Sequence, residues 1–168
     1  MGQRLAINIH SNGELLANAY YHWAGYTGSA LQHAKYIFES GLLTDDFIKA
    51  VSSPTQYAIK LLESTGAGYT DRNKGLIESD PEAMDNTNQW AEAYIAIDLI
   101  NRKVIMDITW IADDEYSNED YNECKVFYFP YSLKECSFED FPALADLYMV
   151  ASPDILHCPD GTIHRPIE

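Results

Sequence analysis

The sequence predicts an α+β fold, in which one antiparallel β-sheet carries helices packed on one of its faces. Asn12-Gly13 separates two runs rich in apolar residues, which is typical of a β-hairpin. Helical spacing follows over residues 28–66, and the second half then favours strands and connecting loops. A chain of 168 residues without a linker rich in Pro, Gly or Ser is expected to form one domain over residues 1–168.

The N-terminal hairpin is expected to turn at Asn12-Gly13, because a type I′ turn needs positive φ at both central residues. A two-residue loop also sets the register of the strands on either side. This register places Tyr21 on the face opposite the core. The predicted pairs are Ile9 with Leu16, Ile7 with Asn18 and Leu5 with Tyr20, and the predicted core face holds Leu5, Ile7, Ile9 and Leu16.

Helices are expected after the hairpin. Apolar residues recur at helical spacing over residues 28–40, and Gly41 suits the position that follows a helix end. Thr44 favours the start of a short helix, because its hydroxyl can cap free backbone N–H groups. Ser53-Pro54 predicts the start of a further helix, since proline is tolerated at the first helical position, and Gly66 predicts its end.

The second half of the chain is predicted to form a meander of strands and one short helix. Alternating apolar residues indicate the strands, and Asn101-Arg102 indicates a turn between two of them. The expected elements are a strand over 75–79, a hairpin of 91–98 and 104–110, a strand over 124–129, a helix over 141–150 and a loop over 152–168.

Charge divides the chain into a neutral half, residues 1–77, and an acidic half, residues 78–168. The first half holds six basic and six acidic side chains, so the five basic and twenty acidic side chains of the second half carry the whole balance of -15. This charge argues against direct nucleic-acid binding, which needs basic surfaces. The start of the chain has no secretory pattern and no apolar run could span a bilayer, so we expect a cytoplasmic protein without a membrane partner. The three cysteines, odd in number and widely spaced, indicate reduced thiols.

The acidic charge is densest over residues 113–123, where six carboxylates interleave with two tyrosines. Spaced carboxylates can imitate a phosphate backbone and bind the basic groove of a protein that handles nucleic acid. Tyrosines can supply the desolvated anchors of such an interface. A solvated loop between strands is the alternative. The predicted partner-binding residues are Asp113, Asp114, Glu115, Tyr116, Glu119, Asp120, Tyr121 and Glu123, with Glu78, Asp80, Glu82 and Asp85 as a possible extension.

An aromatic run over residues 18–27 and a basic loop over residues 66–75 indicate a second candidate site. Aromatic side chains stack on nucleobases, and arginine binds phosphate through paired N–H groups. A nucleotide or cyclic-nucleotide signal is the expected ligand, bound or processed there. The alternative is that the run is core and the loop is a plain turn. The residues of this candidate site are Tyr20, His22, Trp23, Tyr26, Arg72, Asn73 and Lys74.

Neither a metal nor a cofactor is predicted. His157, Cys158 and His164 have ligand-type side chains, but a closed zinc site needs four ligands and the intervening Pro159-Asp160-Gly161 indicates a turn. No nucleophile has a recognisable partner base, so the sequence favours a binding protein over an enzyme.

Two segments carry a resemblance to a class of proteins. Residues 19–27, AYYHWAGYT, and residues 71–77, DRNKGLI, resemble small proteins of phages and prophages. In general character the chain is similar to phage proteins that disarm bacterial defence, including anti-CRISPR proteins, which are small and acidic. This resemblance implies an inhibitor, in the host cytoplasm, of a basic protein that handles nucleic acid. A nucleotide-binding protein is the alternative function.

Overall fold

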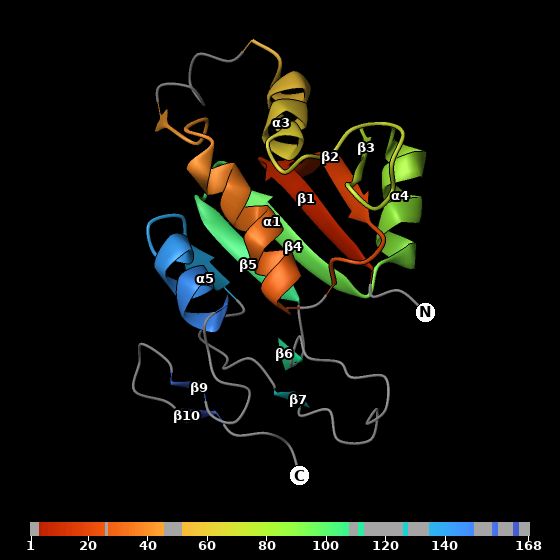
Figure 1. Ribbon diagram of the computed structural model, residues 1–168. Coiled ribbons are helices and arrows are strands. Elements are labelled where there is room, and N and C mark those ends of the chain that lie inside the picture. Colours follow the sequence, from red (N-terminus) through yellow and green to blue (C-terminus); the bar gives the residue numbers. More distant parts are fainter. Residues whose placement is uncertain are drawn as a thin grey trace.

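A six-stranded mixed sheet forms the centre of the computed structural model (Figure 1). The structure describes residues 4–25, 27–45, 52–107, 111–112, 126–127, 135–149, 156–157 and 163–164. The strands of the six-stranded sheet lie in the order β3-β2-β1-β4-β5-β8. They are β1 (Leu5–Ser11), β2 (Glu14–Tyr21), β3 (Leu76–Glu78), β4 (Ala93–Asp98), β5 (Lys103–Asp107) and β8 (Glu135–Ser137).

The sheet has one parallel pair, which the sequence analysis did not predict. β1 runs parallel to β4, with Ile7 opposite Ile95, while the other neighbouring strands of this sheet run antiparallel. Two parallel strands need a long crossover connection between them. The chain between Tyr21 and Ala93 supplies that connection and contains three helices among its described residues. The prediction of an α+β domain is confirmed, and its sheet is mixed rather than wholly antiparallel.

The hairpin turns where predicted but in a different register. Asn12 and Gly13 have φ angles of 52° and 77°, as a type I′ turn requires. The pairing shifts between Ile9 and His10, so that Ile9 lies opposite Ala17 and Leu5 opposite Tyr21. This β-bulge inserts one extra residue into β2. The side chains of β2 that follow the bulge therefore point to the face opposite to the one predicted. The predicted pairs were therefore wrong by one residue.

Within the described residues, four helices pack against the sheet. They are α1 (Thr27–Glu39), α3 (Pro54–Glu63), α4 (Pro81–Trp90) and α5 (Phe141–Met149). The start of α3 is confirmed, because the Ser53 side chain accepts a hydrogen bond from the Gln56 N–H group. Glycines follow the ends of α1 and α3 as predicted, with positive φ at Gly41 and Gly66. The short helix expected after Thr44 falls mainly on residues 46–51, outside the described part of the chain.

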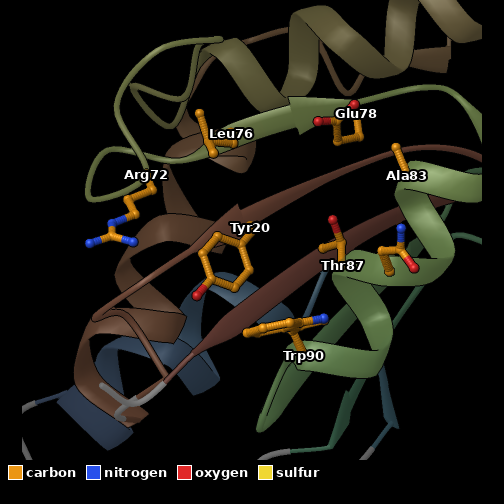
Figure 2. Close-up of a pocket in the computed structure, with 8 residues that line it drawn as sticks. Tyr20, Arg72, Leu76, Glu78, Ala83, Thr87 and Trp90 are labelled. Atoms are coloured by element: carbon orange, nitrogen blue, oxygen red, sulfur yellow. The ribbon is translucent and has the colours of Figure 1, made fainter. Parts of the chain in front are cut away.

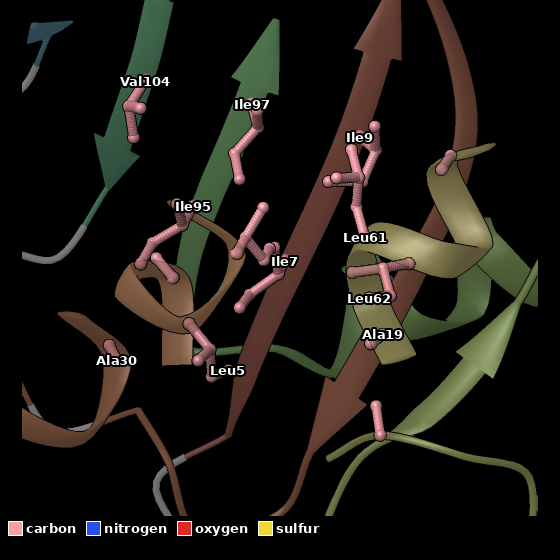
Figure 3. Packing of buried hydrophobic residues seen from close by; sticks show 14 of the residues in the cluster. Leu5, Ile7, Ile9, Ala19, Ala30, Leu61, Leu62, Ile95, Ile97 and Val104 are labelled. Atoms are coloured by element: carbon pink, nitrogen blue, oxygen red, sulfur yellow. The ribbon is translucent and has the colours of Figure 1, made fainter. Parts of the chain in front are cut away.

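One face of the sheet forms the main core with α1, α3 and α5. Figure 3 shows part of this core, including Ala30 of α1 and Leu61 and Leu62 of α3. Side chains of alternate strand residues project toward these helices. Leu5 and Ile7 of β1 lie there beside Ile95 of β4, and all three are fully buried. Leu61 and Leu62 of α3 cover the adjacent strands. Burial of each such side chain contributes roughly 1.5–3 kcal/mol, so this face holds the fold together.

The helix α4 lies on the opposite face of the sheet, contrary to the prediction that helices cover one face only. Asn8 and Asn18 alternate with the core residues of β1 and β2, so their side chains point away from the main core. The Asn18 amide donates hydrogen bonds to the Asn8 side chain and to the Met84 carbonyl oxygen of α4, each of 3.1 Å. Both asparagines are buried, which shows that α4 covers this part of the sheet.

Two short strand pairs lie outside the six-stranded sheet. β6 (Ile111–Ala112) pairs with β7 (Val126–Phe127). β6 directly follows the strand predicted over 104–110, and β7 lies inside the strand predicted over 124–129. β9 (Leu156–His157) pairs with β10 (Ile163–His164), so the predicted loop over 152–168 contains a strand pair. No helix in the described segments is both long and apolar enough to cross a bilayer.

Candidate functional site

A pocket of about 400 Å³ opens between α4 and the end of the sheet formed by β2 and β3 (Figure 2). Aromatic, apolar and charged side chains from these three elements and from the loop before β3 surround it. The lining residues are Tyr20, Arg72, Leu76, Glu78, Ala83, Asn86, Thr87 and Trp90. A volume of this size falls within the range of small-ligand pockets, roughly 300–1,000 Å³.

The loop that carries Arg72 is a tight turn organised by Asp71. The Asp71 carboxylate accepts a hydrogen bond of 2.9 Å from the Asn73 N–H group, and its carbonyl oxygen accepts one of 3.0 Å from the Gly75 N–H group. The backbone oxygen of Arg72 accepts a further hydrogen bond of 3.0 Å from the His22 N–H group. This contact joins the loop to the end of β2 and holds Arg72 beside the pocket.

Gly75 brings the same loop against the main core. Its φ angle is 115°, and a Cβ atom at this position would lie 2.6 Å from Cε1 of Tyr21. The Tyr21 ring is itself fixed, because its hydroxyl forms a buried hydrogen bond of 2.6 Å with the Thr65 side chain. Only glycine combines this backbone conformation with so close an approach.

The other wall of the pocket comes from α4. Asp80 caps this helix by accepting a hydrogen bond of 3.2 Å from the Ala83 N–H group. Trp90 is the last residue of α4, and its side chain is 63% exposed at the pocket edge. The Arg4 guanidinium lies 5.8 Å from the centre of the Trp90 ring and forms an ion pair of 2.8 Å with Glu92. The indole is thus supported from one side and open on another.

Tyr20 lines the pocket and is held in place by its neighbour His22. Its hydroxyl oxygen lies 2.8 Å from Nδ1 of His22, within hydrogen-bond distance. Burial raises the pKa of the Tyr20 hydroxyl above its ordinary value of 10.0, and the nearby Arg4 and Arg72 partly offset this shift. The hydroxyl therefore stays protonated at neutral pH and can take part in neutral hydrogen bonds.

Arg72 differs from several other basic residues of the structure. Arg4, Lys35, Arg102 and Lys103 each form an ion pair, whereas Arg72 forms none with any residue that the structure describes. Its side chain is exposed, and it lines the pocket next to Tyr20. An unpaired guanidinium beside aromatic rings can accept a phosphate or carboxylate group.

The structure brings together only part of the predicted nucleotide site. Tyr20 and Arg72 line one pocket, and His22 lies behind Tyr20. The side chain of Trp23 is 50% exposed and contacts the His22 ring, but it does not line the pocket. Asn73 and Lys74 are also exposed and do not line it, and Tyr26 lies outside the described residues.

The predicted partner-binding run, residues 113–123, lies outside the described residues. Its proposed extension is described and divides between two settings. Glu78 ends β3 and lines the pocket, whereas Asp80, Glu82 and Asp85 are exposed at the start and along α4. This acidic segment is thus a strand end and a helix, and no helix was predicted from the sequence over residues 81–90.

Trp90 and the α4 wall as a whole were not predicted from the sequence. A signal for α4 is present in the sequence, since Asp80-Pro81-Glu82 places a capping residue, a proline at the first helical position and an acid in the first turn. The helix that begins at Pro81 is ten residues long, so Trp90 is its last residue. Its position beside Tyr20 could not be read from the sequence, because it depends on which face of the sheet α4 covers.

Within the described residues, no group of three or more His, Cys, Asp or Glu side chains is placed to hold a metal ion. His157 and His164 lie on the paired strands β9 and β10, and Cys158 lies outside the described part of the chain.

Comparisons of the chain with protein-family models, with curated proteins and with solved structures find no match. The pocket is therefore interpreted from its own chemistry.

Proposed function

We propose that this protein binds a nucleotide, or a cyclic-nucleotide signal, in the pocket between β2, β3 and α4. The observation that carries the proposal is that Tyr20, Trp90 and Arg72 line the same pocket, and that Arg72 forms no ion pair with a described carboxylate. Stacking of a base on an aromatic side chain contributes roughly 1–3 kcal/mol, and a guanidinium can bind phosphate through two hydrogen bonds.

The net charge of -15 does not prevent an anionic ligand from reaching Arg72. At physiological salt, repulsion between exposed charges is screened beyond about 8 Å. Nearby charges matter most, and the guanidinium groups of Arg4 and Arg72 act on Tyr20 together with the carboxylate of Glu92. Arg4 is already paired with Glu92, so Arg72 is the residue assigned to the phosphate.

Thermal-shift measurements with a panel of nucleoside phosphates and cyclic nucleotides test this proposal. A true ligand is expected to raise the melting temperature, since binding stabilises the folded state by about 2.7 kcal/mol at a hundredfold excess over Kd. Arg72→Ala is expected to remove most of this shift. Lys74→Ala is the matched control, because Lys74 is an exposed basic residue of the same loop that does not line the pocket.

The proposal is wrong if no compound in the panel shifts the melting temperature. It is also wrong if Lys74→Ala and Arg72→Ala reduce the shift equally, since binding would then reflect the charge of the loop rather than the pocket.

A second candidate function is inhibition of a bacterial defence system, by binding a basic host protein that handles nucleic acid. The charge distribution favours it: residues 75–101 contain six acidic and no basic side chains. Glu82 and Asp85 are exposed on α4, and the run over 113–123 continues the same charge along the chain. Acidic surfaces of this kind steer association with basic partners and make it sensitive to salt.

A pulldown from bacterial lysate over a salt series tests the second function. We expect a basic nucleic-acid-binding protein to be retained at low salt, released as salt rises, and displaced by duplex DNA. A variant with the six carboxylates of residues 113–123 changed to amides is expected to lose it. Retention that ignores both salt and this variant would contradict the electrostatic mechanism.

A further inference from the structure

Two opposite charges line the pocket without pairing with each other. Arg72 and Glu78 are both lining residues, and neither forms an ion pair with any described residue. In Figure 2, Arg72 lies on the side of Tyr20, whereas Glu78 lies on the side of α4 near Ala83. A ligand that satisfies both charges must present an anionic group at one end and hydrogen-bond donors at the other.

The position of Glu78 follows from the register of β3. Leu76 lies opposite Tyr20 and Glu78 lies opposite Asn18, so the three side chains of Tyr20, Leu76 and Glu78 share one face of the sheet. The helix α4 covers this face. The hydrogen bond from the Asn18 side chain of β2 to the Met84 carbonyl oxygen of α4 holds the helix against the strand. The Glu78 side chain is only half-buried, so its carboxylate oxygens can accept hydrogen bonds from a ligand in the pocket.

We propose that the pocket selects a guanine nucleotide. The inference rests on the proposed nucleotide function and assigns the base. Guanine presents two adjacent donors, N1–H and the N2 amino group, which one carboxylate accepts as a pair of charge-assisted hydrogen bonds. Adenine presents an acceptor, N1, at the corresponding edge, and its lone pair would face the carboxylate. Glu78 therefore favours guanine and disfavours adenine, while Tyr20 or Trp90 stacks on the ring and Arg72 binds the phosphate.

Calorimetric titration of the full chain with GMP, IMP and AMP tests the assignment. Hypoxanthine keeps N1–H but lacks the N2 amino group, so the expected order of affinity is GMP, then IMP, then AMP. A bidentate contact typically discriminates between bases by roughly tenfold or more. We expect at least that ratio between GMP and AMP.

Two variants decide whether Glu78 is the specificity residue. Glu78→Gln is expected to bring the affinities for GMP and AMP within about twofold of each other, because the amide presents a donor as well as an acceptor. Glu82→Gln removes a carboxylate of α4 that does not line the pocket and is expected to keep the wild-type ratio. Circular dichroism checks that both variants fold, and the wild-type series decides the base preference even if one does not.

The outcomes separate this inference from the function on which it rests. Equal binding of GMP and AMP by the wild type overturns the guanine assignment, whereas a ratio unchanged in Glu78→Gln overturns the role of Glu78 as the specificity residue. Either result leaves nucleotide binding standing. Failure of all three nucleotides and of the cyclic nucleotides to bind overturns both.

Discussion

Tyr21 is the residue that connects the main core to the loop of the pocket. Its ring is fully buried, its hydroxyl bonds to Thr65 beyond the end of α3, and its edge contacts the position where Gly75 would carry a Cβ atom. The sequence analysis placed Tyr21 on the outer face, because the bulge at Ile9 and His10 cannot be inferred from the turn residues alone. In contrast, Asn12-Gly13 and Ser53 were predictable, since each acts through its own local backbone.

Replacement of Gly75 by alanine is expected to lower the free energy of unfolding by roughly 1–3 kcal/mol, because the added methyl group overlaps the Tyr21 ring. Gly41→Ala is the matched control: its φ angle is also positive, at 76°, but nothing lies within 4 Å of the added atom. Urea denaturation should show the larger loss for Gly75→Ala. Equal losses would mean that backbone strain, not the contact with Tyr21, determines the need for glycine.

At the scale of elements, α4 forms one wall of the pocket and so determines its shape. It supplies Trp90 and buries Asn18, yet only Met84 and Thr87 of the helix itself are buried. So sparse an apolar stripe gives little periodic signal, which explains why no helix was predicted over residues 81–90. The longer apolar stripes of α1 and α3 were predicted within a residue or two, since each helix buries four residues at helical spacing. These are Ala30, Leu31, Ala34 and Ile37 in α1, and Tyr57, Ala58, Leu61 and Leu62 in α3.

Because α4 buries few apolar groups, its cap should matter more than usual. Asp80→Ala removes the acceptor of the Ala83 N–H group and is expected to reduce the free energy of unfolding by about 0.5–2 kcal/mol. Asp80→Asn keeps a side-chain oxygen at the cap and should recover most of this loss. Urea denaturation of both variants, followed by circular dichroism, measures these changes in the free energy of unfolding. Equal destabilisation by the two variants would attribute the effect to charge rather than to the hydrogen bond.

At the scale of the whole molecule, the buried titratable groups make stability sensitive to alkaline pH. Burial raises the pKa of the Tyr57 hydroxyl and of the Cys136 thiol to about 12, and raises that of Tyr21 further. Each group ionises more readily in the unfolded chain, near pH 9.0 for cysteine and 10.0 for tyrosine. Their contribution to stability is therefore complete below pH 9 and is lost as the pH rises toward 12.

Tyr57→Phe tests the alkaline effect. Near pH 8 the variant should be less stable than the wild type by about 0.5–1.5 kcal/mol, because it loses the hydrogen bond to the Leu42 carbonyl oxygen. This difference should shrink as the pH rises from 10 to 12, since phenylalanine does not ionise. Tyr69→Phe, at a side chain that is 65% exposed, is the control and should follow the wild type. Urea denaturation at each pH measures the difference, and a constant gap would contradict the assignment.

The overall topology was the least predictable level of the structure. Strand and helix segments such as β4 and α3 follow from local patterns, whereas the pairing of β1 with β4 depends on contacts between residues far apart in the chain. The same limit applies to the site. Tyr20 and Arg72 could be proposed as site residues from their residue types. That Trp90 lines the same pocket could not, because it depends on the crossover that brings α4 beside β2.

The parallel pair of β1 and β4 also has a consequence for the order in which the protein can fold during synthesis. β1 has a neighbour on each edge, and β4, which ends at Asp98, supplies one of them. Until the ribosome has made that residue, the backbone groups along one edge of β1 have no partner strand. Residues 1–77 by themselves therefore leave one edge of β1 unpaired, and non-local pairing of this kind slows folding. The acidic half must begin to emerge before the centre of the sheet can close.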